Sequence, residues 1–281
     1  MFLLILVSFI WAFSFGLIKG RLAGVDPTAV AVIRLGLALL VFLPFVRWRG
    51  LGRHTAALVA VGSVQFGVMY LLYLRAFAHL QAFEVALFTI TTPFFVALLD
   101  GALERRFVGR FLLAATLSVA GAAVIVGRKL ASPDLLSGVL LVQASNLCFA
   151  VGQVGWRRLR PRLDPGVSDA SVFGLMYAGA FVLCLLASLA TTDWSALPLG
   201  GSRVATLVYL GVLASGLCFF WWNKGATQVN AGTLAVFNNV KIPLTVACSL
   251  LFFGEQAPVG PLLLGGALVI AGLWLAERRA R

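Results

Sequence analysis

Three ionisable side chains lie inside long apolar segments of this sequence, namely Arg34, Glu84 and Lys241. A charged group at the bilayer centre costs about 2.5–3.5 kcal/mol on insertion scales, so such groups face protein or water and mark function or ion pairing. Lys241 lies near the middle of its segment, with Asn238 on the same helical face and Pro243, which predicts a kink, just beyond it. This lysine is therefore a candidate for binding a carboxylate. The alternative is a structural lysine paired with a neighbouring helix.

Arg34 and Glu84 lie early in two apolar segments that enter the membrane from the same side. They can therefore lie at similar depth. One interpretation is an ion pair that holds two helices together. The other makes Glu84 a buried carboxyl group that couples proton movement to transport.

Amide, hydroxyl and aromatic side chains in the other apolar segments could line a binding site with Lys241. Buried amides in a membrane protein need partners, so their helices face other helices or a cavity. An aromatic wall can hold a cation by cation–π contact or pack against an apolar group. Helix packing is the alternative role for each of these residues. The expected binding residues besides Lys241 and Asn238 are Asn146, Trp11, Trp222, Gln65, Tyr70, Phe88 and Thr91.

Membrane-spanning helices must position these side chains. Apolar residues make up 61% of the 281 residues and charged residues 11%, whereas soluble domains carry about 25% charged residues. The mean hydropathy of +1.00 also indicates that a bilayer is the solvent. The apolar segments are too long and too uniform for barrel strands, so an all-α fold is expected. The predicted spans are 2–18, 29–46, 56–74, 82–99, 108–126, 135–155, 169–190, 203–222, 232–253 and 258–276.

The positive residues predict the orientation. With a cytoplasmic N-terminus, fourteen of the 22 Lys and Arg residues fall in cytoplasmic loops and six on the opposite side. Basic residues favour the cytoplasmic side, so both termini are expected there. The same distribution explains the net charge of +12 without a nucleic-acid partner.

The chain also repeats itself. Residues 103–109 match 254–260 at an offset of 151, Pro93 matches Pro243 at 150, and Asp26-Pro27 matches Asp164-Pro165 at 138. The halves, 1–130 and 131–281, each hold five predicted spans. Because five is odd, the second half is inverted relative to the first. Inverted repeats are common in secondary transporters, whose substrate site lies near the bilayer midplane between the repeats.

The sequence lacks the motifs of several classes of protein. There is no phosphate-binding loop, His-Glu-x-x-His motif or Gly-x-Ser-x-Gly motif. The four cysteines lie inside apolar segments without the spacing of a zinc site or a loop disulfide. The sequence therefore predicts no enzyme activity, no cofactor and no metal.

Three features resemble those of the drug/metabolite transporter superfamily, closest to its ten-helix EamA-type family with two EamA domains. They are the Trp11-Ala12-Phe13-Ser14-Phe15 stretch, Arg34, and the spacings from Pro93 to Glu104 and from Pro243 to Glu255. The resemblance covers essentially the whole chain. It implies transport of amino acids, amines, carboxylates, sugars or other metabolites, and it favours export.

We therefore expect a multi-pass protein of the bacterial inner membrane that exports a small polar metabolite by alternating access. Amino acids and related amines or carboxylates are the first candidates for the substrate. The expected partners are this substrate, the lipid bilayer and protons, and the expected state is a monomer or weak dimer. A lipid or lipid-linked-sugar flippase and a membrane scaffold that transports nothing are the alternatives.

Overall fold

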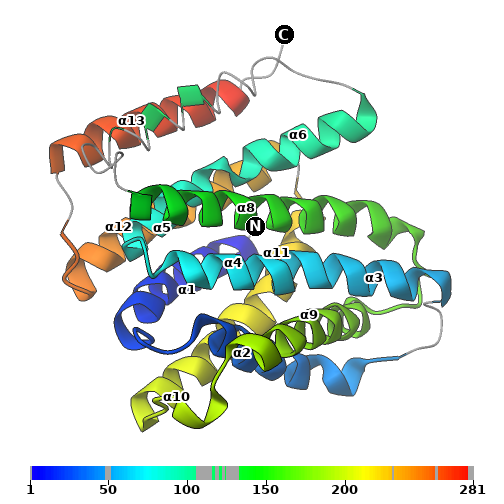
Figure 1. Cartoon of the computed structure of the whole chain (residues 1–281). Coiled ribbons are helices and arrows are strands. Elements are labelled where there is room, and N and C mark those ends of the chain that lie inside the picture. The colour runs from blue at the N-terminus through cyan, green and yellow to red at the C-terminus, as the bar shows by residue number, and fades with distance from the viewer. Residues whose placement is uncertain are drawn as a thin grey trace.

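The computed structural model describes residues 2–47, 52–105, 116–117, 120–121, 124, 133–229, 231–256 and 259–277. Helices are the only regular elements in these residues (Figure 1). Those of the first half are α1 (Phe2–Arg21), α2 (Pro27–Phe42), η1 (Leu43–Phe45), η2 (Gly52–His54), α3 (Thr55–Gly62), η3 (Ser63–Val68), α4 (Met69–Ala76), α5 (Ala82–Phe88), η4 (Thr89–Thr91) and α6 (Thr92–Glu104). Those of the second half are α8 (Pro133–Leu159), η6 (Arg160–Arg162), α9 (Asp169–Thr191), η7 (Trp194–Ala196), α10 (Gly201–Val208), η8 (Tyr209–Leu217), α11 (Cys218–Ala226), α12 (Ala231–Phe252) and α13 (Val259–Glu277).

Seven helical stretches of the described chain are long and apolar enough to cross a membrane. They are Phe2–Arg21, Pro27–Phe45, Thr55–Ala76, Ala82–Glu104, Pro133–Arg162, Asp169–Thr191 and Gly201–Ala226. The all-helical, multi-pass character of the chain is thus confirmed. The predicted span at 108–126 falls largely outside the described residues, so the count of ten spans stays a prediction.

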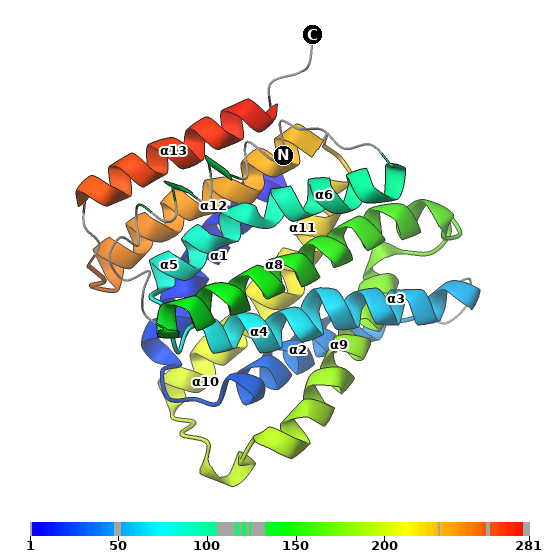
Figure 2. The same cartoon turned by 45° about the horizontal axis from the view of Figure 1, so that its top comes forward.

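The packing of the helices has an internal symmetry. Helix α1 packs against α12 and α11, while α8 packs against α6 and α4 (Figure 2). Helix α2 packs against η8, while α9 packs against α3, and α2 and α9 also contact each other. If each helix of the first half is exchanged with the helix at the same place in the second half, these pairs of neighbouring helices remain the same.

Local signals set where the helices begin. The side chain of Asp26 accepts a hydrogen bond of 2.8 Å from the amide of Ala29, and Pro27 occupies the first turn of α2. Ser168 caps α9 in the same manner through the amide of Ser171, at 3.2 Å. These caps supply the hydrogen bonds that the first turn of each helix otherwise lacks.

Three of the spans change helix type in their middle. The stretch from α3 to α4 contains a π-helical segment, η3, and the stretch from α10 to α11 contains another, η8. The stretch from α5 to α6 is interrupted by the 3₁₀ turn η4, and Pro93 follows in the first turn of α6. Such segments are frequent at functional sites because they turn side chains and carbonyl groups away from the regular helical register.

Glu255 joins the end of α12 to the beginning of α5. Its carboxylate oxygens accept hydrogen bonds from the backbone amides of Ala82 at 2.7 Å and Phe83 at 3.1 Å. A negative charge at a helix N-terminus is favourable because unpaired amides and the helix dipole meet there. This contact helps to fix α5, whose C-terminal end contributes to the cavity described next.

Candidate substrate-binding cavity

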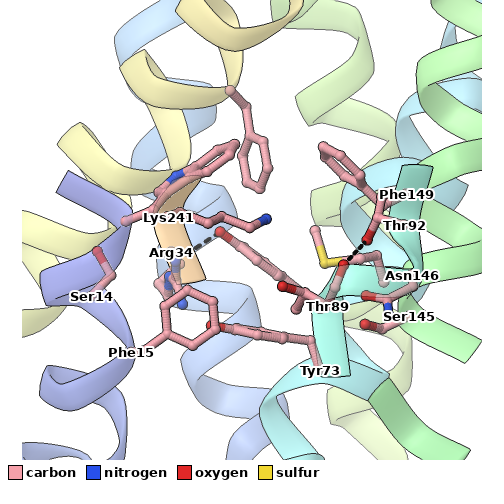
Figure 3. A pocket seen from close by; sticks show the side chains of 14 residues that line it. Ser14, Phe15, Arg34, Tyr73, Thr89, Thr92, Ser145, Asn146, Phe149 and Lys241 are labelled. Atoms are coloured by element: carbon pink, nitrogen blue, oxygen red, sulfur yellow. Dashed lines mark hydrogen bonds between the residues drawn. The ribbon is translucent and has the colours of Figure 1, made fainter. Parts of the chain in front are cut away.

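A cavity of about 570 Å³, including its mouth, lies between helices of both halves. Its lining residues are Trp11, Ser14, Phe15, Arg34, Met69, Tyr70, Tyr73, Thr89, Thr92, Ser145, Asn146, Phe149, Phe219 and Lys241. We call Trp11, Arg34, Tyr70 and Lys241 the cationic wall, and Thr89, Thr92, Ser145 and Asn146 the neutral wall. The labelled members of the two walls lie on opposite sides of the pocket in Figure 3.

Arg34, on α2, is 3% exposed and sits in a network of hydroxyl groups. Its Nη2 donates to the Tyr70 hydroxyl at 2.7 Å and its Nε to the Ser215 hydroxyl at 3.1 Å. The hydroxyl oxygens of Tyr70 and Ser215 are 2.9 Å apart. Ser215 lies in the π-helical segment η8 and donates its proton to the Leu210 carbonyl at 2.6 Å, so it must accept from the other two. Arg34 is thereby held by neutral groups alone.

Lys241, on α12, is 7% exposed and points into the cavity beside an aromatic ring. Its Nζ lies 5.3 Å from the centroid of the Trp11 ring, within the range of a cation–π contact. The Trp11 indole donates to the Ala214 carbonyl at 2.9 Å, which fixes the plane of the ring. Within the described part of the chain, neither Lys241 nor Arg34 forms an ion pair, and no acidic residue lines the cavity.

The neutral wall is built where the helix breaks between α5 and α6. The Asn146 amide nitrogen, from α8, donates to the Phe88 carbonyl at 2.9 Å and to the Thr91 hydroxyl at 3.0 Å. The Thr92 hydroxyl donates to the Thr89 carbonyl at 2.7 Å. Pro93 has no amide proton for the Thr89 carbonyl, which accepts instead from the backbone amide and the hydroxyl of Thr92.

Gln143 supports this wall from outside the cavity. Its amide nitrogen donates to the Phe88 carbonyl at 3.2 Å, and its amide oxygen accepts from the Thr91 hydroxyl at 2.6 Å. Thr91 itself does not line the cavity. It links Gln143 to Asn146 and so holds the Asn146 side chain in place.

The expected contact between Arg34 and Glu84 does not form between these two described residues. Glu84 instead accepts a hydrogen bond of 2.8 Å from the backbone amide of Gln81, in a capping box at the start of α5. Arg34 uses the hydroxyl network of α4 and η8. A role of Glu84 in proton coupling stays a prediction, and the residue does not line the cavity.

Five predicted site residues meet in the cavity, and the others lie around it. Lining it are Lys241, Asn146, Trp11, Tyr70 and Arg34. The fully buried Trp222 ring lies tilted against the Trp11 ring, with 5.1 Å between the centroids, and the Gln65 amide donates to Asn223 at 3.3 Å. Phe88 contributes its carbonyl to the support of the neutral wall. Asn238 is on α12, but its side chain lies outside the described part of the chain.

Three residues line the cavity although they were not predicted from the sequence as binding residues, and each has a feature in the sequence that could have indicated it. They are Thr89, Ser145 and Tyr73. Ser145 adjoins Asn146, and Tyr73 lies one turn after Tyr70. Thr89 lies four residues before Pro93, where a proline leaves a carbonyl unpaired.

The sequence and the fold both resemble those of known proteins. Residues 1–127 and 136–277 match the EamA-like transporter family. The probable biotin transporter of Pseudomonas aeruginosa is 43% identical over 274 residues, which cover 97% of this chain and 96% of that protein. The biotin transporter of Escherichia coli is 40% identical over 282 residues, covering 99% and 93%. A chain of known crystal structure, 21% identical, has a similar fold with a TM-score of 0.66 over 96% of this chain and 95% of that one.

Proposed function

The chain belongs to the EamA-like transporter family, and on this premise we propose that it is a secondary transporter of the bacterial inner membrane for a small carboxylate. Biotin is the first candidate for the substrate. The observation that supports this most is the pair of buried cations, Arg34 and Lys241, in a cavity whose described lining holds no acidic residue.

Electrostatics favours an anionic ligand in this cavity. Burying a cation without an anion is costly because the charge loses its hydration, and hydroxyl groups return only part of that loss. A ligand carboxylate beside Lys241 supplies the missing charge and forms charge-assisted hydrogen bonds. The aromatic side chains around it, including Phe15, Phe149 and Phe219, can pack against an apolar part of the same ligand.

The names of the relatives narrow the choice of carboxylate. The two relatives described above are named for biotin, a molecule with a carboxylate on an apolar chain and a neutral ureido ring. Such a molecule suits a cavity with a cationic wall, apolar sides and a neutral wall. The preference for amino acids expected from the sequence has no specific support from these relatives, so we propose biotin first.

The proposed mechanism is alternating access between two inverted five-helix halves, 1–130 and 131–281, with both termini cytoplasmic. The exchange symmetry of the helix neighbours and the π-helical segments in the third span of each half, η3 and η8, support this arrangement. The cavity lies between helices of both halves, where rocking of one half against the other would open it to each side in turn.

Counterflow of radiolabelled biotin in proteoliposomes tests the proposal. The wild-type protein is expected to show saturable counterflow, and Lys241→Met is expected to lower it about 100-fold or more because the carboxylate loses its charged partner. Lys224→Met is the matched control, since Lys224 is exposed at the end of α11 and outside the cavity.

Two outcomes would overturn the proposal. One is the absence of saturable flux of biotin or any other small carboxylate through the folded wild-type protein. The other is normal transport by the Lys241→Met variant. Thermal unfolding of each purified variant shows that the protein is folded before it is reconstituted.

A further inference from the structure

The hydroxyl protons of both threonines of the neutral wall are already in use. The Thr89 hydroxyl donates to the Ala86 carbonyl at 2.7 Å, and the Thr92 hydroxyl donates to the Thr89 carbonyl at 2.7 Å. A hydroxyl has a single proton to donate and two lone pairs that accept. Both threonines therefore offer the cavity hydrogen-bond acceptors and no donors.

Asn146 also offers an acceptor. A carbonyl cannot donate, so the atom of the Asn146 amide next to the Phe88 carbonyl must be the nitrogen. The nitrogen is further tied to the Thr91 hydroxyl. The amide oxygen of Asn146 has no hydrogen-bond partner among the described residues, and the residue lines the cavity.

Ser145, which precedes Asn146 on α8, supplies the complementary group. Its hydroxyl makes no hydrogen bond within the described part of the chain, and the residue lines the cavity as well. The Ser145 proton is therefore free to donate to a ligand. The neutral wall thus places a free donor next to several fixed acceptors.

We propose that the neutral wall binds an amide- or urea-type group at the end of the substrate remote from its carboxylate. Such a group presents N–H donors beside a C=O acceptor. Its N–H groups can donate to the oxygens of Asn146 and the two threonines, and its C=O group can accept from the Ser145 hydroxyl. The inference rests on the proposed function, in which Lys241 on the opposite wall binds the carboxylate (Figure 3). The protein would then select carboxylates with N–H groups at the far end and reject those without them.

The protein would reject ligands without N–H groups because they leave the acceptors of the neutral wall unpaired. Fatty acids and N-methylated ureas would place carbon against the oxygens of Asn146, Thr89 and Thr92. Those buried acceptors would lose water without gaining a donor, and unpaired buried polar groups weaken binding more than a good pair strengthens it. The selectivity therefore resides in the neutral wall, while the cationic wall binds any carboxylate.

Equilibrium binding of labelled biotin to the full-length protein in detergent, with competition by biotin methylated at both ureido nitrogens, tests this inference. The wild type is expected to bind biotin roughly tenfold or more tightly than the methylated form, the value of one to two net hydrogen bonds. Asn146→Leu is expected to reduce that ratio to roughly twofold. Lys241→Met is expected to weaken both ligands together.

Thr89→Val gives a second measurement, because Asn146→Leu also removes support from the Phe88 carbonyl. Valine is close to threonine in shape and removes the hydroxyl, which is both the acceptor offered to the cavity and the donor to the Ala86 carbonyl, so the ratio of the two affinities should fall about threefold. Thr206→Val is the matched control, since Thr206 is buried on α10 outside the cavity and its hydroxyl likewise donates to a carbonyl of its own helix, that of Ser202.

Equal affinity of the wild type for biotin and its methylated form would overturn the inference and leave the carboxylate site intact. An unchanged ratio in both Asn146→Leu and Thr89→Val would also overturn it. Absence of any carboxylate binding by the folded wild type would overturn the proposed function and this inference together.

Discussion

The two walls of the cavity differ in chemistry, although residues in or beside them lie at matching positions of the sequence. Trp11 and Phe149 are related by the 138-residue offset of the Asp-Pro pairs, and Lys241 and Thr91 by the 150-residue offset of the two prolines. Trp11 and Lys241 belong to the cationic wall, whereas Phe149 lines the cavity and Thr91 supports Asn146 from outside it. Positions that share an offset in the sequence therefore differ in the charge and polarity that they bring to the cavity.

The backbone also differs between the two halves at the matching prolines, Pro93 and Pro243. Pro93 follows a 3₁₀ turn at the start of α6, whereas Pro243 lies inside the continuous helix α12. On the neutral side, Pro93 cannot donate to the Thr89 carbonyl, which accepts instead from the backbone amide and the hydroxyl of Thr92. The broken helix thus adds side-chain hydrogen bonds to those of the backbone and presents acceptors to the cavity.

Arg34→Met should produce the largest effect, because it removes a charge from the cationic wall and also its hydrogen bonds to Tyr70 and Ser215. We expect biotin affinity to fall about 100-fold and the free energy of unfolding to fall by about 3 kcal/mol, since hydrogen bonds to charged groups contribute about 1.5–3 kcal/mol each. Binding measurements and thermal unfolding of the purified variant check both values.

Arg34→Lys serves as the control for charge, since it keeps the cation and loses the fork that reaches two hydroxyls. It should retain more affinity than Arg34→Met. If Arg34→Met bound biotin as the wild type does, the proposed contribution of this wall would reduce to Lys241 alone.

Trp11→Phe should have an intermediate effect, because it weakens the contact with Lys241 and gives position 11 the side chain of its matching residue, Phe149. The variant loses the indole hydrogen bond to the Ala214 carbonyl and the stronger cation–π partner of Lys241. We expect roughly tenfold weaker biotin binding, measured by equilibrium titration.

Trp156→Phe is the matched control for that substitution. Trp156 is buried away from the cavity, and its indole nitrogen has no hydrogen-bond partner among the described residues. Its replacement should leave biotin affinity unchanged. Equal losses in the two variants would mean that Trp11 acts through general packing and not through Lys241.

The rule that membrane-buried polar groups are costly predicted much of this site from the sequence. It selected Arg34, Lys241 and Asn146, which meet in the cavity from three different helices. For the seven described stretches long enough to cross a membrane, the apolar segments predicted the first residue to within two positions and the last to within seven.

Two kinds of information were beyond the sequence. The first is pairing between distant helices: Arg34 donates to Tyr70 and to Ser215, which is 181 residues away, and not to Glu84. The second is local change of helix type. Ser215 bonds to the carbonyl five residues earlier because tertiary packing stabilises a π-helical segment, which no periodicity of apolar residues indicates. Thr89 likewise lines the cavity from η4, the 3₁₀ turn that interrupts the helix between α5 and α6.

Gln143→Leu should produce the smallest effect, because Gln143 supports the neutral wall without lining the cavity. It therefore tests the neutral wall separately from the cationic wall. The Phe88 carbonyl keeps its bond from Asn146, so the fold and the cationic wall should be unaffected. Thr91 loses a bond, and Asn146 becomes less firmly oriented. We expect about threefold weaker biotin binding, with affinity for the N-methylated form unchanged, since one positioning hydrogen bond contributes about 0.5–1.5 kcal/mol. An equal loss for both ligands would place Gln143 in the general packing of α8 and would separate it from the selection of N–H groups.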